Sequence, residues 1–454
     1  MNQNIYIYRT FKYTWEIRIR GRKMSKAKEV TDEVIDKKII SKMIDEITKL
    51  LNERYIFKDV AKKIDETLQK KFEDGEFNDA KDAQTFAVKV DKVLQEISND
   101  GHLHILYDPY RMEQLIADRE MSEKEKDKIK KERIARLKKS NFGFNKLEIL
   151  EGNIGYLDLR RFCHTDFAAE TASYAMNFLA NTDSIIIDMR NNGGGEPEMV
   201  VLIASYFIKK RTMFNTFDRP FEGYVEQYWT LPYVPGKSLC DKELYILTSK
   251  RTYSAGEDFT YGMQCQKRAT IIGETTGGGA HPINFFSILD KLILNLPTGR
   301  SINPISKTNW EGVGVKPDIP IEADFAFHKA YELALDNVIK KAKDKGQKLI
   351  LEYAKKKMLS EIQEVNVDLK ILEQYQGKYG NNDIKLEDST LTFYSEHAGK
   401  IKLTPISESY FKFEDNSMDS IGVVFSKDDK TGDMEVSYLY ISDNEVFTRK
   451  RNAK

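Results

Sequence analysis

The chain has 454 residues, of which 41% are hydrophobic and 31% charged. At ~100 to 200 residues per domain, this length predicts two or three domains and excludes a small scaffold held together by disulfides or a metal. Lysine plus arginine and aspartate plus glutamate number 71 each, so no field of one sign favours nucleic acid as a partner. The function therefore has to be found in a local site.

Few sequence features report on the compartment. The cysteines Cys163, Cys240 and Cys265 are too scattered for a disulfide framework or a CxxC zinc site, and we expect them to be buried thiols. No apolar run approaches the ~18 residues of a membrane span, and residues 1–23 lack the apolar core of a secretion signal, so the compartment is left open, with the cytoplasm as the default. Those residues are basic and aromatic and end before Met24, which we interpret as a candidate natural start.

Residues 30–108 predict a three-helix bundle. After a capping Thr31, apolar residues recur every three or four positions, as on one face of a helix, and the pattern returns before and after the turn at 73–76. The apolar positions that define the helices are Ile40, Met43, Ile44, Ile47, Leu50, Leu51, Val60, Ile64, Leu68, Phe72, Phe86, Val90, Val93, Leu94 and Ile97. Residues 1–29 precede the bundle as an extension, and residues 109–140 are so rich in both charges that we expect a solvated helical linker.

Between residues 141 and 330, short apolar runs alternate with helical stretches, which is typical of an α/β core with a largely parallel sheet. The predicted strands are 154–162, 184–189, 244–248 and 270–273, and the predicted helices are 168–180, 197–209 and 255–266. Ligands bind at the carboxyl ends of the strands in such sheets. A lysine-rich helical connector is expected over 331–368. Residues 369–454, with short strands between polar turns, predict a small all-β domain, either a barrel or a sandwich.

A serine follows the predicted strand 244–248. Ser254 lies in Thr-Tyr-Ser-Ala-Gly-Glu and opens the helical stretch 255–266, so the backbone N–H groups and the positive end of the helix dipole lie beside its hydroxyl. Such groups stabilise an anion that develops during acyl transfer. The alternative is a plain N-cap, because serine is one of the preferred residues at that position.

The segment 184–195 is an apolar strand that ends in three glycines. Glycine permits positive φ and close backbone approach, so Gly193, Gly194 and Gly195 are candidates for aiming peptide N–H groups at a carbonyl oxygen. The same device binds phosphate, but the segment has neither the GxGxxG spacing nor the Lys-Ser/Thr of a Walker loop. A tight turn is the simpler interpretation.

Histidines and carboxylates occur in three further polar segments. His102 and His104 follow the helical bundle, and a neutral imidazole at His102 has the properties of a general base, with a surface turn as the alternative. The pair lacks a third ligand, so we predict no metal site and no cofactor. Glu274 and Glu311 lie in glycine-rich loops, where either carboxylate is able to orient an imidazole or to serve only in a turn.

Taken in chain order, these segments resemble the serine peptidase family of tail-specific and tricorn-core proteases, in the branch similar to interphotoreceptor retinoid-binding protein. The matching motifs extend from Thr31 to Phe327 and are NDGH, NFGFNKLEILEGNIGYLDLR, IIIDMRNNGGG, LTSKRTYSAGEDF, KRATIIGETTGGGAHP and NWEGVGVKPDI. The resemblance implies a crotonase-like α/β core behind a helical bundle, acting on a peptide or protein substrate without a metal. The tail, residues 369–454, resembles the small lipocalin-like β domain of some bacterial hydrolases.

The resemblance also implies roles for individual residues. Ser254 matches the nucleophile, His102 the general base and Glu311 the carboxylate that holds the base. The other site candidates are the oxyanion donors Gly194 and Ala255 and the supporting residues Gly193, Gly195 and Glu274. The oligomeric state is left open.

The chain departs from the family pattern in three places. Members with a Ser/Lys dyad carry the lysine in the stretch where this chain has Gly279, so we do not expect a Ser/Lys dyad here. The tricorn branch has a serine immediately before the base, where this chain has Gly101. The segment between His102 and Gly152 is too short and too charged for a PDZ module. A non-catalytic module that binds a retinoid, a lipid or a peptide on the same fold is the alternative function.

Overall fold

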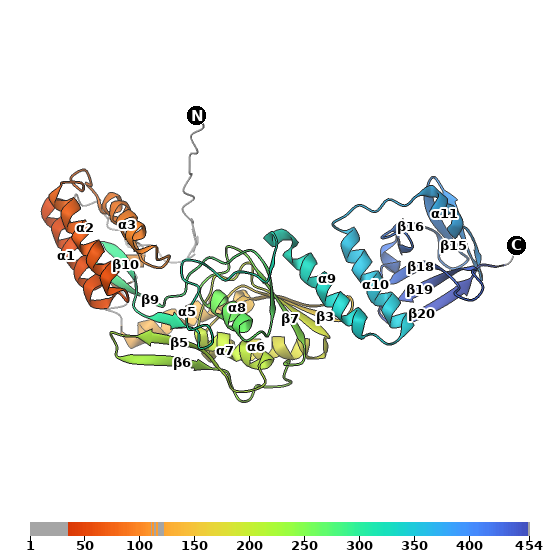
Figure 1. The fold of residues 1–454 in the computed structure, drawn as a ribbon, viewed down its shortest axis with the longest axis horizontal. Helices are drawn as coiled ribbons and strands as arrows, with labels where there is room; N and C mark the ends of the chain where they lie inside the picture. Colours follow the sequence, from red (N-terminus) through yellow and green to blue (C-terminus); the bar gives the residue numbers. More distant parts are fainter. Residues whose placement is uncertain (1–34, 110, 113–114, 117–121, 453–454) are drawn as a thin grey trace.

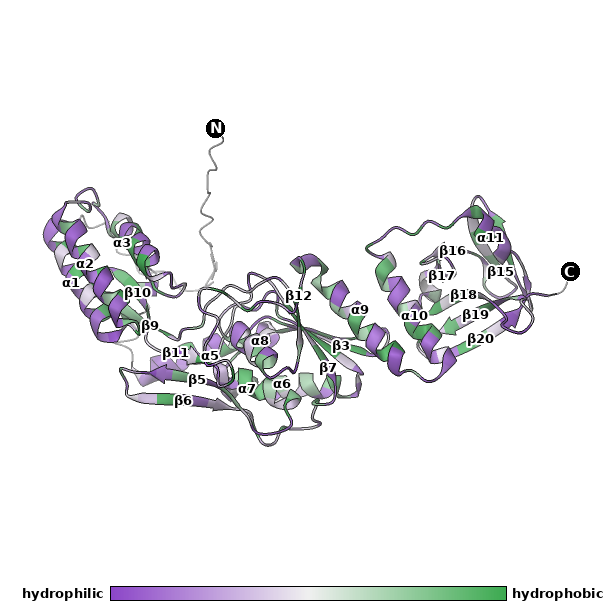
Figure 2. Ribbon diagram, viewed as in Figure 1, coloured by the Kyte–Doolittle hydropathy of each residue, from purple (hydrophilic) through white to green (hydrophobic). Residues whose placement is uncertain are grey.

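The computed structural model describes residues 35–109, 111–112, 115–116 and 122–452, and the candidate start at Met24 lies outside them. The described chain is elongated, with the N-terminal helices at one end, the α/β core in the middle and the C-terminal strands at the other end (Figure 1). The central strands of the core are the most uniformly hydrophobic part, whereas hydrophobic and hydrophilic residues alternate along the N-terminal helices (Figure 2).

Three helices occupy the region of the predicted bundle. They are α1 (Lys37–Arg54), α2 (Lys58–Glu73) and α3 (Ala83–Ser98), and the carboxylates of Asp36 and Asp82 cap α1 and α3. Their apolar faces pack on the hairpin of β9 (Ile283–Ile288) and β10 (Leu292–Pro297), and β1 (His104–Leu106) pairs antiparallel with β10. The sequence assigned this hairpin to the α/β core, so its packing against the N-terminal helices is a difference from the prediction.

The central sheet has the strand order β12-β8-β7-β4-β3-β2. Its strands are β2 (Phe144–Leu150), β3 (Ile154–Leu159), β4 (Ser184–Asp188), β7 (Glu243–Thr248), β8 (Thr270–Gly273) and β12 (Ile319–Pro320). All neighbours are parallel except β2 and β3, which confirms the largely parallel sheet. Strands β3 and β4 are buried along their whole length because helices cover both faces of the sheet.

Alternate residues of each strand contact different helices. Leu157, Ile185 and Ile246 pack against α6 (Thr165–Phe178), α7 (Pro197–Phe207) and α8 (Ala255–Cys265). Tyr156 and Ile186 face the opposite side, which α9 (Ala323–Lys341) and α10 (Lys345–Ser360) cover. The expected boundary between core and connector at 330–331 therefore falls inside α9, a helix that packs on the sheet.

The remaining elements lie outside the central sheet. They are the charged helix α5 (Glu123–Lys139), the short 3-10 helices at Asn141–Gly143, Leu179–Asn181 and Asn416–Met418, and a small antiparallel sheet of β11 (Arg300–Ile302), β5 (Met213–Arg219) and β6 (Tyr224–Trp229). No residue of α5 is buried, which agrees with the solvated helix predicted there.

The C-terminal region is a helix followed by one antiparallel sheet whose strands pair in chain order. The elements are α11 (Leu369–Tyr375), β13 (Gly377–Tyr379), β14 (Asn382–Glu387), β15 (Thr390–Ser395), β16 (Gly399–Pro405), β17 (Tyr410–Phe413), β18 (Ile421–Lys427), β19 (Met434–Tyr440) and β20 (Glu445–Lys450). A bridge between Tyr379 and Arg451 joins the two ends of the sheet, so it closes as a barrel rather than a sandwich. Aromatic side chains fill its core, where Tyr375 stacks on Phe425.

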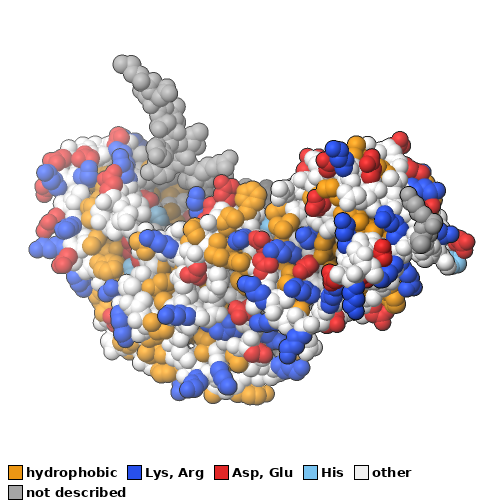
Figure 3. All heavy atoms as spheres, turned by 45° about the vertical axis from the view of Figure 1, so that its right-hand side comes forward, with side chains coloured by type: hydrophobic (Ala, Val, Ile, Leu, Met, Phe, Trp, Pro, Cys, Tyr) orange, Lys and Arg blue, Asp and Glu red, His pale blue; other side chains and the backbone are white. Residues whose placement is uncertain are grey.

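The surface gives little indication of a partner. Positive and negative side chains are interspersed over the face shown in Figure 3. In the part of the chain that the structure describes, no helix has the length and apolar character needed to cross a bilayer. Cys163 is buried as expected, whereas Cys240 and Cys265 are only partly buried, so the prediction of three buried thiols is wrong for those two.

Candidate active site

Three loops meet at the carboxyl edge of the central sheet, where the neighbouring strands β4, β7 and β8 end. The first loop carries the three glycines at 193–195, and the second carries Ser254. The third carries the glycine-rich segment at 273–279, called here the second glycine-rich loop. Backbone hydrogen bonds join them, from Tyr253 N–H to the Asn192 carbonyl and from Gly277 N–H to the Thr252 carbonyl, each 3.0 Å long. The parallel strand order thus brings together segments that are far apart in the chain.

Ser254 has a backbone conformation that residues other than glycine rarely adopt, with φ 53° and ψ −121°. It is the N-cap of α8, and its own N–H donates to Glu257 Oε2 at 2.9 Å. A conformation of this kind costs of order 1–3 kcal/mol and is concentrated at functional sites. Ser254 therefore caps the helix, and its strained conformation is in addition what a functional residue at this position would show.

The amide next to Ser254 is free. Among the described residues, the N–H of Ala255 has no hydrogen-bond acceptor within range, as expected for the first residue of a helix. Gly194 lies so close that a Cβ on it would stand 2.8 Å from Ser254 Cβ and 3.1 Å from Ala255 N. Its own N–H already donates to Asn192 Oδ1 at 2.8 Å, so a bound carbonyl oxygen would have to displace Asn192 to use this donor.

Glu257 joins the serine to the second glycine-rich loop and was not among the predicted site residues. Its carboxylate is fully buried and accepts four hydrogen bonds, two on each oxygen. The donors are the N–H groups of Ser254, Gly278 and Gly279 and the hydroxyl of Thr276. Burial raises the pKa of Glu257, although these hydrogen bonds oppose the rise. The Ser-x-x-Glu spacing of a capping box was the sequence signal for this residue.

We expect Glu257→Gln to lower the free energy of unfolding by about 3–5 kcal/mol, because either orientation of the new amide places an NH2 group against two donors that lose their acceptor. Urea unfolding of the full chain measures the loss. Glu274→Gln is the matched control: that carboxylate is only partly buried and accepts a single long bond of 3.4 Å from Lys250 N–H, so its change should stay below about 1 kcal/mol. Equal losses in the two variants would contradict the role of Glu257.

His102 lies at the junction of the helical bundle and the core. Its Nδ1 is 3.6 Å from Glu311 Oε2, and its ring packs on Tyr253, the residue before Ser254, with ring centroids 5.1 Å apart. The hydroxyl of Tyr253 donates to the Gly101 carbonyl at 3.1 Å. The structure thus brings the two predicted residues His102 and Glu311 together and holds them against the loop that carries the serine.

Two other candidates lie apart from the imidazole of His102. Glu274 contacts Lys250, with Oε1 3.8 Å from Nζ, and takes no part in holding His102. His104 points to the helical bundle, where its Nδ1 is 3.0 Å from Asp91 Oδ1. This pairing with Asp91 raises the pKa of His104, although burial opposes the rise.

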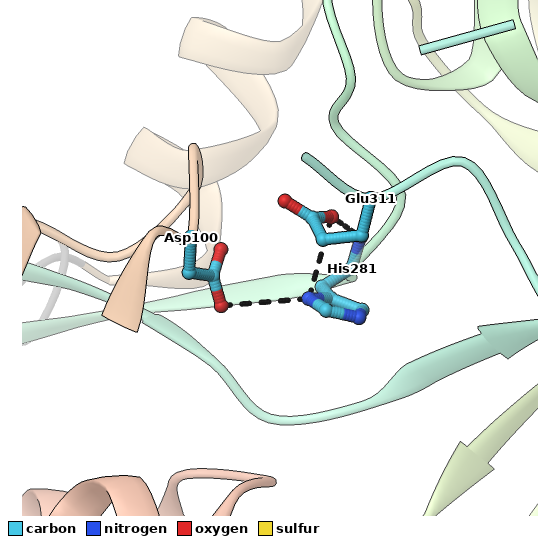
Figure 4. Close-up of side chains that lie close together, drawn as sticks. All are labelled: Asp100, His281 and Glu311. Atoms are coloured by element: carbon cyan, nitrogen blue, oxygen red, sulfur yellow. Dashed lines mark hydrogen bonds and ion pairs between the residues drawn. The ribbon is translucent and has the colours of Figure 1, made fainter. Parts of the chain in front are cut away.

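Asp100 and His281 complete the surroundings of Glu311, and the sequence did not predict either of them. His281 Nδ1 is 3.4 Å from Asp100 Oδ2 and 3.3 Å from Glu311 Oε2 (Figure 4). Asp100 also accepts the hydroxyl of Tyr55 at 2.9 Å and the N–H of His102 at 3.0 Å. Burial alone would raise the pKa of Asp100, but these contacts outweigh it and hold the pKa below its ordinary value.

Asp258 is a second buried carboxyl in the first turn of α8. Its Oδ1 accepts one hydrogen bond of 2.8 Å from Asn215, and burial raises its pKa to about 7. The unfolded carboxyl has a pKa of ~3.9, so between about pH 4 and pH 7 the unfolded state loses a proton that the folded state keeps. The stability of the protein therefore falls as the pH rises through that window.

We expect Asp258→Asn to abolish this pH dependence. The variant should match the wild type near pH 4 and exceed its stability by up to ~4 kcal/mol above pH 7, because the amide has no charge to bury. Thermal unfolding of both proteins at pH 4.5 and pH 8 measures the difference. If the difference between the two proteins is the same at both pH values, Asp258 is ionised in the fold at no cost.

A serine at a helix N-terminus, a free neighbouring amide and a histidine–glutamate pair are together typical of the serine hydrolase class. Residues 153–321 match the family model of peptidase family S41, and residues 24–148 match that of the N-terminal domain of this peptidase in eukaryotic IRBP. The two matches together span more than half of the chain, which therefore belongs to peptidase family S41. This confirms the family that the motifs indicated.

Several relatives of known name align with a little over a third of this chain. The carboxyl-terminal-processing protease of Synechocystis is 26% identical over 172 residues, 37% of this chain and 38% of that protein. Carboxyl-terminal-processing peptidase 2, chloroplastic, of Arabidopsis thaliana is 27% identical over 173 residues, 38% of this chain and 32% of that protein. The chain thus spans about two fifths or less of the length of these relatives.

Solved structures of the same kind align over longer stretches. A putative peptidase from Parabacteroides merdae has a TM-score of 0.45 at 18% identity and covers 65% of this chain and 96% of its own. The tricorn protease has a TM-score of 0.41 at 15% identity and covers 70% of this chain and 37% of its own.

Proposed function

We propose that this chain is a serine peptidase that hydrolyses peptide bonds of a peptide or protein substrate through an acyl-enzyme. The observation that carries the proposal is the position of Ser254, which is held in a strained conformation at the N-terminus of α8 beside a free amide. A serine that only capped the helix would not need that strain. Membership of peptidase family S41 supports the same reaction.

In this reaction Ser254 Oγ attacks the peptide carbonyl while His102 takes its proton. Because Nδ1 of His102 faces Glu311, Nε2 is the nitrogen left for the serine, and Glu311 stabilises the imidazolium that forms. The N–H of Ala255 donates to the oxyanion of the tetrahedral intermediate. His102 then passes the proton to the leaving amine, and water hydrolyses the acyl-enzyme.

The Gly193–Gly195 segment is the proposed second side of the oxyanion site. Gly194 N–H serves there only when it exchanges Asn192 for the substrate oxygen. Asn192 is fully buried and also donates to the Leu159 carbonyl at 2.8 Å, so the exchange leaves its Oδ1 without a donor and is costly. This exchange makes Ala255 the donor that is ready before substrate binds.

We further propose that the parallel core is crotonase-like and that the C-terminal barrel is lipocalin-like. The proposed domains are the bundle at 30–108, the linker at 109–140, the core from 141 and the barrel at 369–454. Packing of α9 and α10 on the central sheet supports extending the core to residue 360.

The alternative, a non-catalytic module for a retinoid, a lipid or a peptide, has less support. The pocket beside Glu311 is lined mainly by polar side chains, whereas an apolar ligand needs apolar walls. A binding module also gives no reason to keep a serine, an imidazole and a carboxylate at one edge of the sheet.

The deciding experiment is intact-mass measurement after incubation with a fluorophosphonate probe. We expect one adduct on the wild type, mapped to Ser254, and none on Ser254→Ala or His102→Ala. Thermal unfolding of the three proteins verifies that they are folded. A folded wild type that stays unlabelled at high probe concentration would contradict the proposed function and direct attention to ligand binding.

A further inference from the structure

In the cluster of Asp100, His281 and Glu311, the imidazole lies farther from both carboxylates than a proton shared in a hydrogen bond would place it. The two contacts of His281 Nδ1, at 3.3 and 3.4 Å, are longer than the ~2.7–2.9 Å of a charge-assisted hydrogen bond. Nδ1 makes no hydrogen bond to any described residue, although the side chain of His281 is only 2% exposed. A buried polar atom without a partner requires a physical reason.

The same distances suit a metal ion. Ligand atoms at about 2.0–2.2 Å from Zn²⁺ in tetrahedral geometry lie about 3.3–3.6 Å from one another, as His281 Nδ1 does from both carboxylates. One oxygen of each carboxylate and this nitrogen all lie within 4.8 Å of one another.

Both carboxylates keep the capacity to bind an ion. Glu311 Oε2 already accepts the backbone N–H groups of Ala280 and His281, at 2.5 and 3.1 Å, so the oxygen left for an ion is Oε1, which is buried and has no hydrogen-bond partner among the described residues. Asp100 is oriented by the hydroxyl of Tyr55 and the N–H of His102, as metal-binding carboxylates usually are by their neighbours.

The negative charge of the two carboxylates also favours a bound cation. Asp100 is 2% exposed, and the side chain of Glu311 is 12% exposed. No lysine or arginine that the structure describes lies within ion-pair distance of either carboxylate. Two buried carboxylates that face only the imidazoles of His102 and His281 have no permanent positive charge beside them, and a divalent ion would balance them.

The geometry points to a binding site for a divalent transition-metal ion of the zinc class, formed by Asp100, His281 and Glu311, in which the bound ion inhibits the peptidase by taking Glu311 from His102. The site is reachable, since all three residues line an open pocket of about 260 Å³. The inhibition rests on the proposed function, whereas the binding does not. Three protein ligands leave the fourth position of a tetrahedral site for water.

Calorimetry with Zn²⁺ and visible absorption with Co²⁺ test the binding on the full chain. We expect one equivalent of Zn²⁺ per chain and the intense absorption of four-coordinate Co²⁺ on the wild type. His281→Gln and Asp100→Asn should each weaken binding at least ~10-fold, with thermal unfolding as the check that they fold. His104→Gln is the matched control, because His104 pairs with a single carboxylate, Asp91, and should bind the ion as the wild type does.

Inhibition is measured separately, as the rate at which a fluorophosphonate labels Ser254. Saturating Zn²⁺ should slow labelling of the wild type at least ~10-fold, and a chelator should restore it. Failure of the wild type to bind Zn²⁺ or Co²⁺, or binding that His281→Gln leaves unchanged, overturns the metal site whatever the labelling shows. Binding without any slowing of labelling overturns the inhibition. An unlabelled wild type refutes the peptidase and leaves the calorimetry to decide the site.

Discussion

Replacing Gly194 with alanine is expected to lower kcat/KM at least ~100-fold while the protein stays folded. The new Cβ would lie 2.8 Å from Ser254 Cβ and 3.0 Å from the Tyr253 carbonyl, at a φ of +101° that suits glycine alone. The backbone cannot move away, because Phe162 N–H donates to the Gly194 carbonyl at 3.0 Å. The serine must therefore shift, and the oxyanion site shifts with it. Steady-state kinetics on a peptide substrate measure the loss.

Gly193→Ala is the control for this prediction. A Cβ on Gly193 meets no atom within 4 Å, and alanine keeps the backbone N–H. We expect its kcat/KM to stay within about threefold of the wild type, because it neither fills the site nor removes a donor. If both variants lose activity equally, the loss comes from the flexibility of the loop. If neither does, the glycine segment is not part of the oxyanion site.

The sequence predicted the parts of the site that depend on short spacing. The position of Ser254 at the N-terminus of a helix was predicted because a strand, a serine and a helical stretch follow one another, and the spacing to Glu257 belongs to the same local pattern. The roles of His102 and Glu311 depended on resemblance, since no local rule relates a turn after α3 to a loop beyond β11. The family models cover the segments that carry both residues but do not test their roles, which stay a prediction.

The residues that were missed depend on contacts between distant segments. Asp100 and His281 meet because the hairpin of β9 and β10 leaves the core and pairs with β1 beneath the helices. Leu292, Leu294 and Leu296 alternate as in any half-buried strand, and this alternation does not reveal which surface the strand covers. Without that partner, His281 was only one residue of a glycine-rich loop.

The contact between Tyr253 and Gly279 gives the second large prediction, because it couples His102, the proposed general base, to the loop that carries Ser254. A Cβ on Gly279 would lie 2.2 Å from Tyr253 Cζ and 2.6 Å from His102 Cε1, so both rings must move. Gly279 itself is held on both sides, since its N–H donates to Glu257 at 2.8 Å and its carbonyl accepts Trp310 Nε1–H at 3.0 Å.

We therefore expect Gly279→Ala to lower kcat at least ~100-fold, since a displacement of about 1 Å in a catalytic group has that effect. The rate of fluorophosphonate labelling should fall in parallel, because in the proposed mechanism His102 activates Ser254 in both reactions. Gly299→Ala is the control, because a Cβ there meets nothing closer than 3.3 Å. A Gly279→Ala protein that unfolds like the wild type yet keeps full activity would show that His102 does not act from the position seen here, and that the base must be sought elsewhere.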